Sequence, residues 1–506
     1  MDNKGKGKVQ GGFSSRWGLV LTMIGACVGT GNVWKFPRMV TLHGQGSFIL
    51  AWTIILFAIS IPVLLVEMVM GRATRHGAAG AFKDFIGEKY TWMGAFMAGT
   101  TVLITAYYTV IMGWCVRYMY YSIKGFGQYN LAGLDQLFQN ASNGWVNVLI
   151  FIALLILTAI VVMKDISSGI EKVGKVMTPA LYIILIVLFI RVITLPNASS
   201  GLQFMFEVSP KTFFSVDTWI AALNQSAWSV GPGFGLVIAM AVYTKAKSDV
   251  AMNTFMQGLG DNSAALLAGF VVVPGLFALA PSVEAATELA ATGNYGLTFI
   301  SFTQLFASLP GGSVLSFLFF LGLFFAAFTA NIIFYLTGVV PLMDTGMSKK
   351  KACGYVFVPT LFLGVFSAYN ITFLDNQDLV WGMALLIGAT FTCFAAVKFG
   401  VEKIRTKYIN IPENDLPIGK WWNVCISVIA PVMIVGLFAW TVYEGIAGDS
   451  NWWNPLNPSS VGTYLFQIGI LLALVLAFNR KMNKSIRNNY IDTAEVYPEI
   501  PQEHLA

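Results

Sequence analysis

Charged side chains are scarce in this sequence. Only 11% of its 506 residues are Asp, Glu, Lys or Arg, whereas 56% are hydrophobic and the mean hydropathy is +0.68. Soluble domains are about a quarter charged, so the composition excludes an ordinary water-soluble protein. Apolar runs of about twenty residues, long enough to cross the hydrocarbon core of a bilayer, recur from Gly18 to Arg480. The chain is therefore predicted to be an all-α protein that spans a membrane many times.

Cysteine and histidine are also few. The five cysteines have no CxxC spacing, and none falls in a long outer loop. The three histidines lie near the ends of apolar runs or in the last residues of the chain. We therefore expect neither a disulfide nor a metal cluster, and no nucleophile or histidine–acid group indicates an enzyme. The first sixteen residues are polar and glycine-rich, with no cleavage site after the first apolar run, so no signal peptide is predicted.

Twelve membrane spans are predicted, beginning near residues 17, 48, 92, 145, 173, 217, 261, 313, 352, 377, 421 and 460. Alternating the loops between the two sides places 25 of the 31 Lys and Arg residues on one side. By the positive-inside rule that side is cytoplasmic, and both termini lie there. The chain is thus expected in the cytoplasmic membrane, in contact with lipid. No basic patch with stacking aromatics exists on a soluble surface, so a nucleic-acid partner is not expected.

Two of the predicted spans are interrupted by glycine and proline. The first span has Gly25, Gly29 and Gly31 in its middle, and the sixth reads WSVGPGFG around Pro232. Proline removes a helix hydrogen bond and glycine loosens the helix. Glycine is also a common packing residue in membrane helices, and for either cluster alone that explanation is about equally good.

The positions of the two clusters favour a functional reading. They fall in the first and sixth spans, the corresponding members of two five-helix halves, as in inverted-repeat transporters. The ends of half-helices present free N–H groups to an anion and free carbonyls to a cation. The sequence therefore predicts a binding site for a zwitterion and cations.

At these segments the sequence resembles the neurotransmitter:sodium symporter family, whose bacterial prototype is LeuT. The resemblance is carried, in the family's order, by SRWGLVLTMIGACVGTGNVWKFP, IPVLLVEMVMGR, AYYTVIMGW, SSGIEKVGKVMTP, TWIAALNQSAWSVGPGFG, GLTFISFTQLFASLPGG, FFAAFTANI and FLDNQDLVWGM. It implies a cytoplasmic segment (1–15), two inverted repeats of five helices (16–200 and 201–400), two further helices (401–482) and a cytoplasmic tail (483–506). It also implies a sodium-coupled symporter that imports a small amino acid by alternating access.

The resemblance implies sodium as the coupling ion. The family's first sodium site falls on the carbonyl of Cys27 and on the side chains of Asn32, Ser229 and Asp261. Its second site falls on the carbonyls of Gly25, Val28 and Ala326 and on the hydroxyl of Thr329. Asp261 stands where the family usually has asparagine, and Ala330 stands where it has a serine ligand. One sodium ion or two are expected. No chloride is expected, since the positions of the family's chloride ligands hold Trp52, Gln225, Ser229 and Ala265.

The resemblance also implies a substrate pocket. Its residues are Ala26, Cys27, Thr30, Gly31, Ile104, Tyr108, Trp228, Ser229, Gly231, Phe234, Ala330, Asn331 and Phe334. Tyr108 is expected to bind a carboxylate. Monoamine-carrying members have an aspartate where this chain has Gly29, which favours an amino acid. Gly231 enlarges the pocket and Trp228 supplies stacking surface, so an apolar or aromatic substrate side chain is favoured.

The family closes this pocket with two gates. The outer gate falls on Lys35 and Asp378, with Trp228 as the gating aromatic. The inner gate falls on Asp344 and Tyr243. Its usual arginine and tryptophan are replaced by Gln10 and Phe13, so Lys8 or Lys6 is expected to substitute. Glu67 and Glu171 match family positions with structural roles.

Two alternatives to an amino-acid symporter are compatible with the sequence to different degrees. A sodium- or proton-linked transporter of an amine without a carboxylate is conceivable, with Asp261 supplying the negative charge. An ion channel or sensor fits less well, because the polar groups converge on two broken helices rather than on a continuous pore. The particular substrate and the oligomeric state are left open by the sequence.

Overall fold

The computed structural model describes residues 12–245, 247–280 and 282–487, and this part of the chain contains helices and no strand. The first half contains α1 (Arg16–Cys27), α2 (Thr30–Leu42), α3 (Gln45–Ile55), α4 (Ile61–Thr74), α6 (Thr91–Lys124), α8 (Trp145–Met163) and α9 (Ile170–Val192). The second half contains α12 (Val216–Ser229), α13 (Leu236–Ala241), α14 (Val250–Leu279), α18 (Gly312–Met343), α19 (Lys349–Tyr369) and α20 (Ile371–Phe399). They are followed by α23 (Ala430–Gly448), α24 (Val461–Ala477) and α25 (Asn479–Ser485).

Within the described ranges, nine helices are long and apolar enough to cross a membrane, or eleven when each of two bent pairs is counted as one span. The bent pairs are α1 with α2 and α24 with α25. The predicted sixth span, near residues 217–241, is divided into α12 and α13. The many-span fold is confirmed, whereas the exact count of twelve and the inverted symmetry stay predictions.

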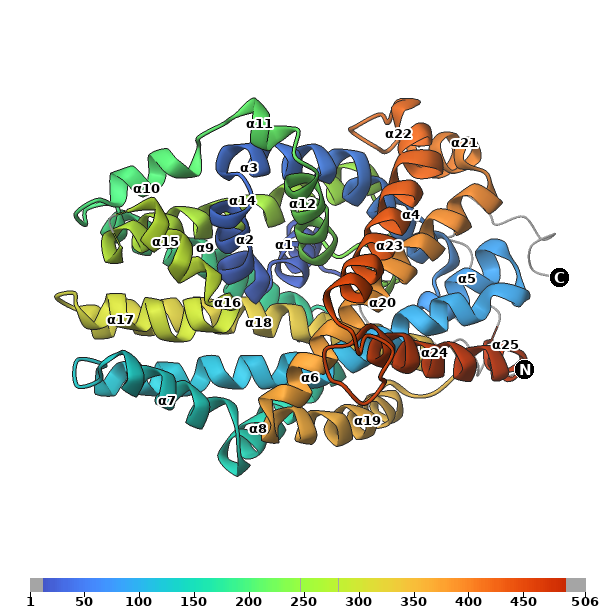
Figure 1. Cartoon of the computed structure of the whole chain (residues 1–506). Helices are drawn as coiled ribbons and strands as arrows, with labels where there is room; N and C mark the ends of the chain where they lie inside the picture. Colours follow the sequence, from blue (N-terminus) through green and yellow to red (C-terminus); the bar gives the residue numbers. More distant parts are fainter. Residues whose placement is uncertain (1–11, 246, 281, 488–506) are drawn as a thin grey trace.

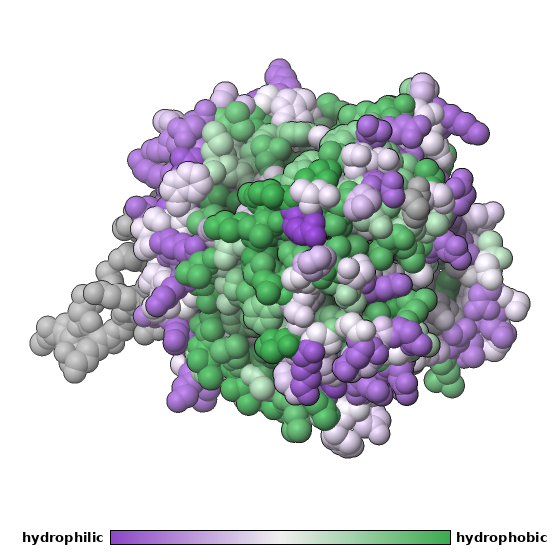
Figure 2. Space-filling view, turned by 90° about the vertical axis from the view of Figure 1, so that its left-hand side faces the viewer, coloured by the Kyte–Doolittle hydropathy of each residue, from purple (hydrophilic) through white to green (hydrophobic). Residues whose placement is uncertain are grey.

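The long helices α6 and α18 pack along one another through the middle of the molecule (Figure 1). Helix α1 packs against α9 and α14, and α13 packs against α4. Short helices, including α7 (Leu131–Ser142), α10 (Ala198–Met205), α15 (Val283–Ala291) and α17 (Phe302–Ala307), gather at the left of Figure 1, and α5 (Ala78–Ile86) and α25 lie at the right. In Figure 2 a broad apolar area is flanked by hydrophilic residues, as expected where the flanks of a protein meet lipid.

Both described ends of the chain lie at one end of the bundle. The N–H of Phe13 donates to the carbonyl of Tyr243 at 3.4 Å, and the N–H of Arg487 donates to the carbonyl of Asp344 at 3.0 Å. The Tyr243 hydroxyl in turn lies 3.9 Å from the sulfur of Met343. We call this end of the bundle the inner end.

The predicted interruptions of the first and sixth spans are confirmed. Helix α1 ends at Cys27 and α2 begins at Thr30, with a bend of 55°. Between α12 and α13 the chain passes through Gly231, Gly233 and Gly235, whose φ angles are +81°, +89° and +76°. A Cβ on Gly233 would lie 2.4 Å from the backbone nitrogen of Ala389. This segment therefore needs glycine for its backbone conformation and for its approach to α20.

The two acids that were assigned structural roles hold irregular backbone in place. The buried carboxylate of Glu67 accepts the N–H of Gly233 at 2.8 Å, inside the unwound segment. Glu171 on α9 accepts the N–H and the hydroxyl of Ser14 at 2.7 and 2.6 Å and pairs with Lys175 at 2.6 Å. The start of α1 is thereby fixed to α9.

Candidate functional site

A cavity of about 280 Å³ lies between the two interrupted helices, α6, α18 and α20. It is lined by the predicted pocket residues Ala26, Cys27, Thr30, Gly31, Ile104, Tyr108, Trp228, Ser229, Gly231, Phe234, Ala330 and Phe334. Asn331 differs from the prediction and does not line the cavity. Its amide nitrogen instead donates to the hydroxyls of Thr109 and Thr158 at 3.0 and 3.1 Å, because its side chain points from α18 toward α6 and α8. Asn331 therefore links α18 to α6 and α8 by hydrogen bonds.

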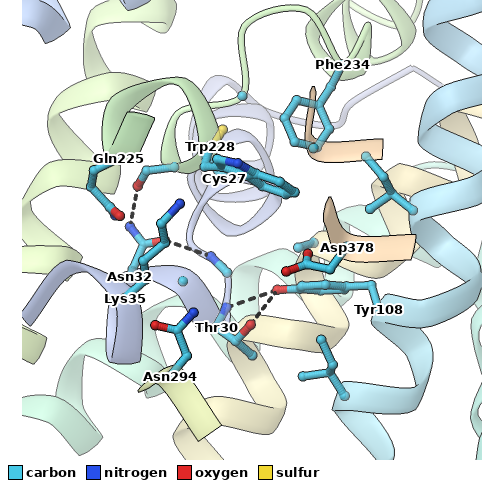
Figure 3. A pocket seen from close by; sticks show the side chains of 18 of the residues that line it. Cys27, Thr30, Asn32, Lys35, Tyr108, Gln225, Trp228, Phe234, Asn294 and Asp378 are labelled. Atoms are coloured by element: carbon cyan, nitrogen blue, oxygen red, sulfur yellow. Dashed lines mark hydrogen bonds between the residues drawn. The ribbon is translucent and has the colours of Figure 1, made fainter. Parts of the chain in front are cut away.

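Tyr108 contacts the backbone at the break between α1 and α2. Its hydroxyl accepts the N–H of Thr30 at 2.9 Å, the first helical residue of α2 (Figure 3). A Cβ on Gly29 would lie 2.6 Å from the same hydroxyl, so a side chain at position 29 would collide with the tyrosine. The phenol and the exposed start of a half-helix thus form one polar corner that can receive an anionic group.

Trp228 lies across the cavity, with Lys35 and Asn32 on one side and Tyr108 and Asp378 on the other (Figure 3). The ammonium group of Lys35 is 5.4 Å from the centroid of the indole and donates to the amide oxygen of Asn224 at 3.0 Å. Lys35 and Asp378 both line the cavity, but in this conformation they are not within the 4.0 Å of an ion pair. The charged end of Lys35 is therefore held by Trp228 and Asn224, and the expected pairing with Asp378 is not formed.

Gly382 on α20 makes room for the indole. A Cβ at this position would lie 2.1 Å from the Cζ2 atom of Trp228. Asn224 and Gly382 lie within two of the family motifs, TWIAALNQSAWSVGPGFG and FLDNQDLVWGM, but no role was predicted for either residue. Asn294 lies two residues before a third motif, GLTFISFTQLFASLPGG. All three line the cavity, so the signal was present in the segments but not at these residues.

The side chains predicted for the first sodium site are brought together at the edge of the cavity, which Asn32 and Ser229 line. Asp261 accepts hydrogen bonds from Asn32 at 2.8 Å and from Ser229 at 2.6 Å, and the Asn32 amide also donates to Ser229 at 3.0 Å. Cys27, whose carbonyl was the fourth predicted ligand, packs nearby. Its thiol donates a hydrogen bond to the carbonyl of Val230 and accepts one from the amide nitrogen of Gln257.

The carboxylate of Asp261 is fully buried, and none of the ion pairs among the described residues includes it. A buried carboxylate without a cationic side chain is costly. The oxygen-rich surroundings of Asp261 suit a hard cation such as Na⁺. The donor set of this chain thus fits the sodium ion that the resemblance implies.

The residues of the second predicted sodium site also meet. A Cβ on Gly25 would lie 3.1 Å from the Cβ of Thr329, so α1 and α18 touch there. The Thr329 hydroxyl bonds the carbonyl of Ala326 at 3.1 Å, and Val28 is fully buried beside the break. Sequence reasoning missed Thr178 of α9, whose hydroxyl would be 2.5 Å from that same Cβ.

At the inner end, Asp344 accepts the N–H of Gly77 at 2.8 Å. Tyr243 meets the described start of the chain through Phe13. Lys6 and Lys8, which are expected to substitute for the inner-gate arginine, and Gln10, which stands in its place, lie outside the described residues. The inner-gate assignment of Asp344 and Tyr243 stays a prediction.

Comparison with known proteins decides the family. The sequence profile of the sodium:neurotransmitter symporter family matches residues 10–132 and 126–484. This chain belongs to that family. It is a sodium-dependent symporter and not an enzyme.

Individual relatives agree with this assignment. The chain is 27% identical over 442 residues to an uncharacterised sodium-dependent transporter of Methanocaldococcus jannaschii, covering 84% of this chain and 89% of that one. It is 22% identical over 517 residues to the human sodium- and chloride-dependent neutral and basic amino acid transporter B(0+), covering 86% and 80%. A solved structure of MhsT in complex with L-phenylalanine is similar with a TM-score of 0.75 and 25% identity, covering 85% of this chain and 99% of MhsT.

The contact between Gly382 and Trp228 gives a test of the cavity. We expect Gly382→Ala to push the indole from its place and to weaken sodium-dependent substrate binding by roughly tenfold, because close-packed sites tolerate little added volume. Adding Trp228→Phe to this variant should restore much of the affinity, since the smaller ring leaves room for the methyl group. Equilibrium binding of radiolabelled substrate measures both. The control is Gly436→Ala, whose Cβ meets nothing within 4 Å; an unchanged affinity in Gly382→Ala would contradict the arrangement.

Proposed function

We propose that this symporter imports a small amino acid together with Na⁺ by alternating access, and that an apolar or aromatic side chain on the substrate is favoured. The observation that carries the proposal is the cavity between the two interrupted helices, where the corner formed by Tyr108 and Thr30 lies beside the cluster of Asn32, Ser229 and Asp261. Such a site can hold a carboxylate and a cation next to each other. The apolar remainder of the cavity, which includes Phe234 and Phe334, is left for the substrate side chain.

The proposed orientation places the inner end in the cytoplasm, with both termini there and the chain in the cytoplasmic membrane. The excess of Lys and Arg in the loops on that side supports it. Trp228 and Lys35 would cover the substrate from outside, with Asp378 facing them. Asp344 and Tyr243 would close the inner end. Besides its substrate, the chain has membrane lipid as its partner; a nucleic-acid partner is not part of the proposal.

Sodium coupling through the first site is proposed to dominate. Asp261 adds a formal charge to that site, and two unit charges at contact distance attract by about 4 kcal/mol at an effective dielectric constant near 20. The second site has Gly25, Val28, Ala326 and Thr329 but lacks the serine hydroxyl, because Ala330 replaces it. We therefore propose one sodium ion at high affinity and no chloride requirement.

One alternative is supported by a specific observation. Asp261 places a carboxylate of the protein itself beside the cavity. That charge would serve an amine that lacks a carboxylate, with sodium or a proton as the coupling ion. Uptake experiments separate this alternative from the amino-acid proposal.

Uptake into proteoliposomes tests the function directly. Radiolabelled apolar and aromatic amino acids should accumulate when an inward sodium gradient is imposed, and accumulation should stop when sodium is replaced by potassium or choline. Amines without a carboxylate should not compete. Accumulation of such an amine, with no uptake of any amino acid, would overturn the proposal in favour of the alternative.

Tyr108 is expected to recognise the carboxylate of the substrate. We expect Tyr108→Phe to lower substrate affinity by roughly ten- to a hundredfold, because a hydrogen bond to a charged group contributes about 1.5 to 3 kcal/mol. The thermal unfolding of the ligand-free protein should change far less. Substrate titrations of the purified variant measure the effect. Tyr355→Phe, on the exposed face of α19, is the matched control, and equal affinity in both variants would contradict the carboxylate assignment.

A sodium titration tests the two cation sites. The native protein should show a Hill coefficient near one for sodium-dependent substrate binding. Asp261→Asn should raise the sodium concentration needed for half-saturation by at least roughly tenfold, since it removes the formal charge. Ala330→Ser should move the Hill coefficient toward two, because it adds the missing hydroxyl. A native coefficient of two, or full sodium affinity in Asp261→Asn, would rule the proposal out.

A further inference from the structure

A second, polar cavity of about 950 Å³ opens at the inner end, away from the transport site. We call it the basic pocket and define it by Ser348, Lys350, Lys351, Lys484 and Arg487. Its walls come from the loop that follows α18, from the start of α19, from the end of α25 and from Arg487. No Asp or Glu lines it. Four cationic side chains therefore face one space without a carboxylate.

The walls of the basic pocket are fixed to the rest of the fold. The N–H of Arg487 bonds the carbonyl of Asp344, and the guanidinium of Arg487 lies against Gly346, where a Cβ would be 2.4 Å from its Cζ atom. Asn483 on α25 donates to the carbonyl of Glu88 at 2.6 Å. The fixed walls thus hold like charges close together, which is electrostatically unfavourable. Positive charge is also unfavourable in the first turn of α19, at the N-terminal end of the helix dipole.

None of the four cationic side chains forms an ion pair with a described residue. Within the described ranges, the charge of the basic pocket is left uncompensated. An anion bound there would relieve the repulsion and would accept hydrogen bonds from ammonium and guanidinium groups.

Two apolar helix faces lead into the basic pocket. On α19, Tyr355, Val358 and Phe362 are 61%, 65% and 63% exposed and follow Lys351 at helical spacing. On α24, Phe466, Ile470 and Leu474 are exposed at helical spacing, and exposed Phe478 follows the helix and directly precedes α25. Both helices pack against α6. In a membrane protein such faces contact acyl chains, so an anion with acyl chains matches the whole surface.

We propose that the basic pocket binds the phosphate-bearing headgroup of an anionic phospholipid, whose acyl chains lie along the exposed faces of α19 and α24. Clusters of basic residues at the membrane surface attract such lipids. The bound headgroup would bridge the loop after α18 to α25, next to Asp344. Another anionic group is close in the sequence: residues 488–506 contain Asp492, Glu495, Glu499 and Glu503 and no Lys or Arg. The apolar faces that adjoin the basic pocket favour the lipid, because one lipid molecule supplies both an anionic group for the pocket and acyl chains for those faces.

Native mass spectrometry of the purified full chain tests this site without measuring transport. The probes are phosphatidylglycerol and phosphatidylcholine with identical acyl chains. The wild type should retain phosphatidylglycerol in preference. A variant with Lys350→Gln, Lys351→Gln and Lys484→Gln should retain at least roughly tenfold less phosphatidylglycerol than the wild type, because each basic residue near an anionic headgroup adds to the attraction.

The matched control carries Lys172→Gln, Lys407→Gln and Lys420→Gln, which remove the same charge from exposed positions outside the basic pocket. It should retain phosphatidylglycerol like the wild type. Equal retention by the pocket variant and the control would overturn the proposal.

A further variant neutralises the acidic segment with Asp492→Asn, Glu495→Gln, Glu499→Gln and Glu503→Gln. It should retain phosphatidylglycerol within about twofold of the wild type. Strong retention that appears only in this variant would identify the acidic segment as the occupant and would also overturn the proposal.

Discussion

Backbone N–H and C=O groups in the hydrocarbon core of a membrane must be paired within the protein, because lipid offers them no hydrogen bonds. This chain breaks two helices at that depth and must therefore satisfy the freed groups by other means. Asn32 accepts the N–H of Gly29 at the first break, and Glu67 accepts the N–H of Gly233 at the second. The cavity lies beside both breaks, so its walls include irregular backbone that these side chains stabilise.

The buried carboxylate of Asp261, beside the cavity, imposes a second constraint on the fold. Asp261 is buried with two hydrogen bonds and no cationic side chain, an arrangement that becomes favourable when a cation is bound. Its neighbours Asn32 and Ser229 come from the two interrupted helices, α2 and α12. A cation bound at this point would therefore link both breaks to α14. This gives a physical reason for ion binding to affect the shape of the cavity.

The outer side of the cavity shows how a family arrangement is adapted. The basic residue at this outer gate is Lys35, and an ammonium group cannot make the planar, two-pronged contact of a guanidinium. Here it bonds Asn224 and lies over the indole of Trp228. Tryptophan offers the best cation–π surface of the aromatic side chains, and Gly382 leaves space for the indole. The lysine, the tryptophan and the glycine therefore form one consistent set, although they are distant in the sequence.

The helices of this protein and the positions of their breaks follow from short stretches of its sequence. Apolar runs of membrane length predicted the helices, and glycine with proline predicted where two of them are interrupted, because both effects act on the backbone of the residues concerned. The residues that the family motifs singled out, Tyr108, Asn32, Ser229 and Asp261, lie close together in the fold, and their roles stay predictions. Tertiary structure alone decided which side chains meet across helices: Asn331 bonds Thr109 and Thr158 instead of facing the cavity, Lys35 bonds Asn224 instead of pairing with Asp378, and Gly382 receives the indole. Such contacts depend on the rotation and depth of packed helices, which the spacing of residues along one helix does not specify.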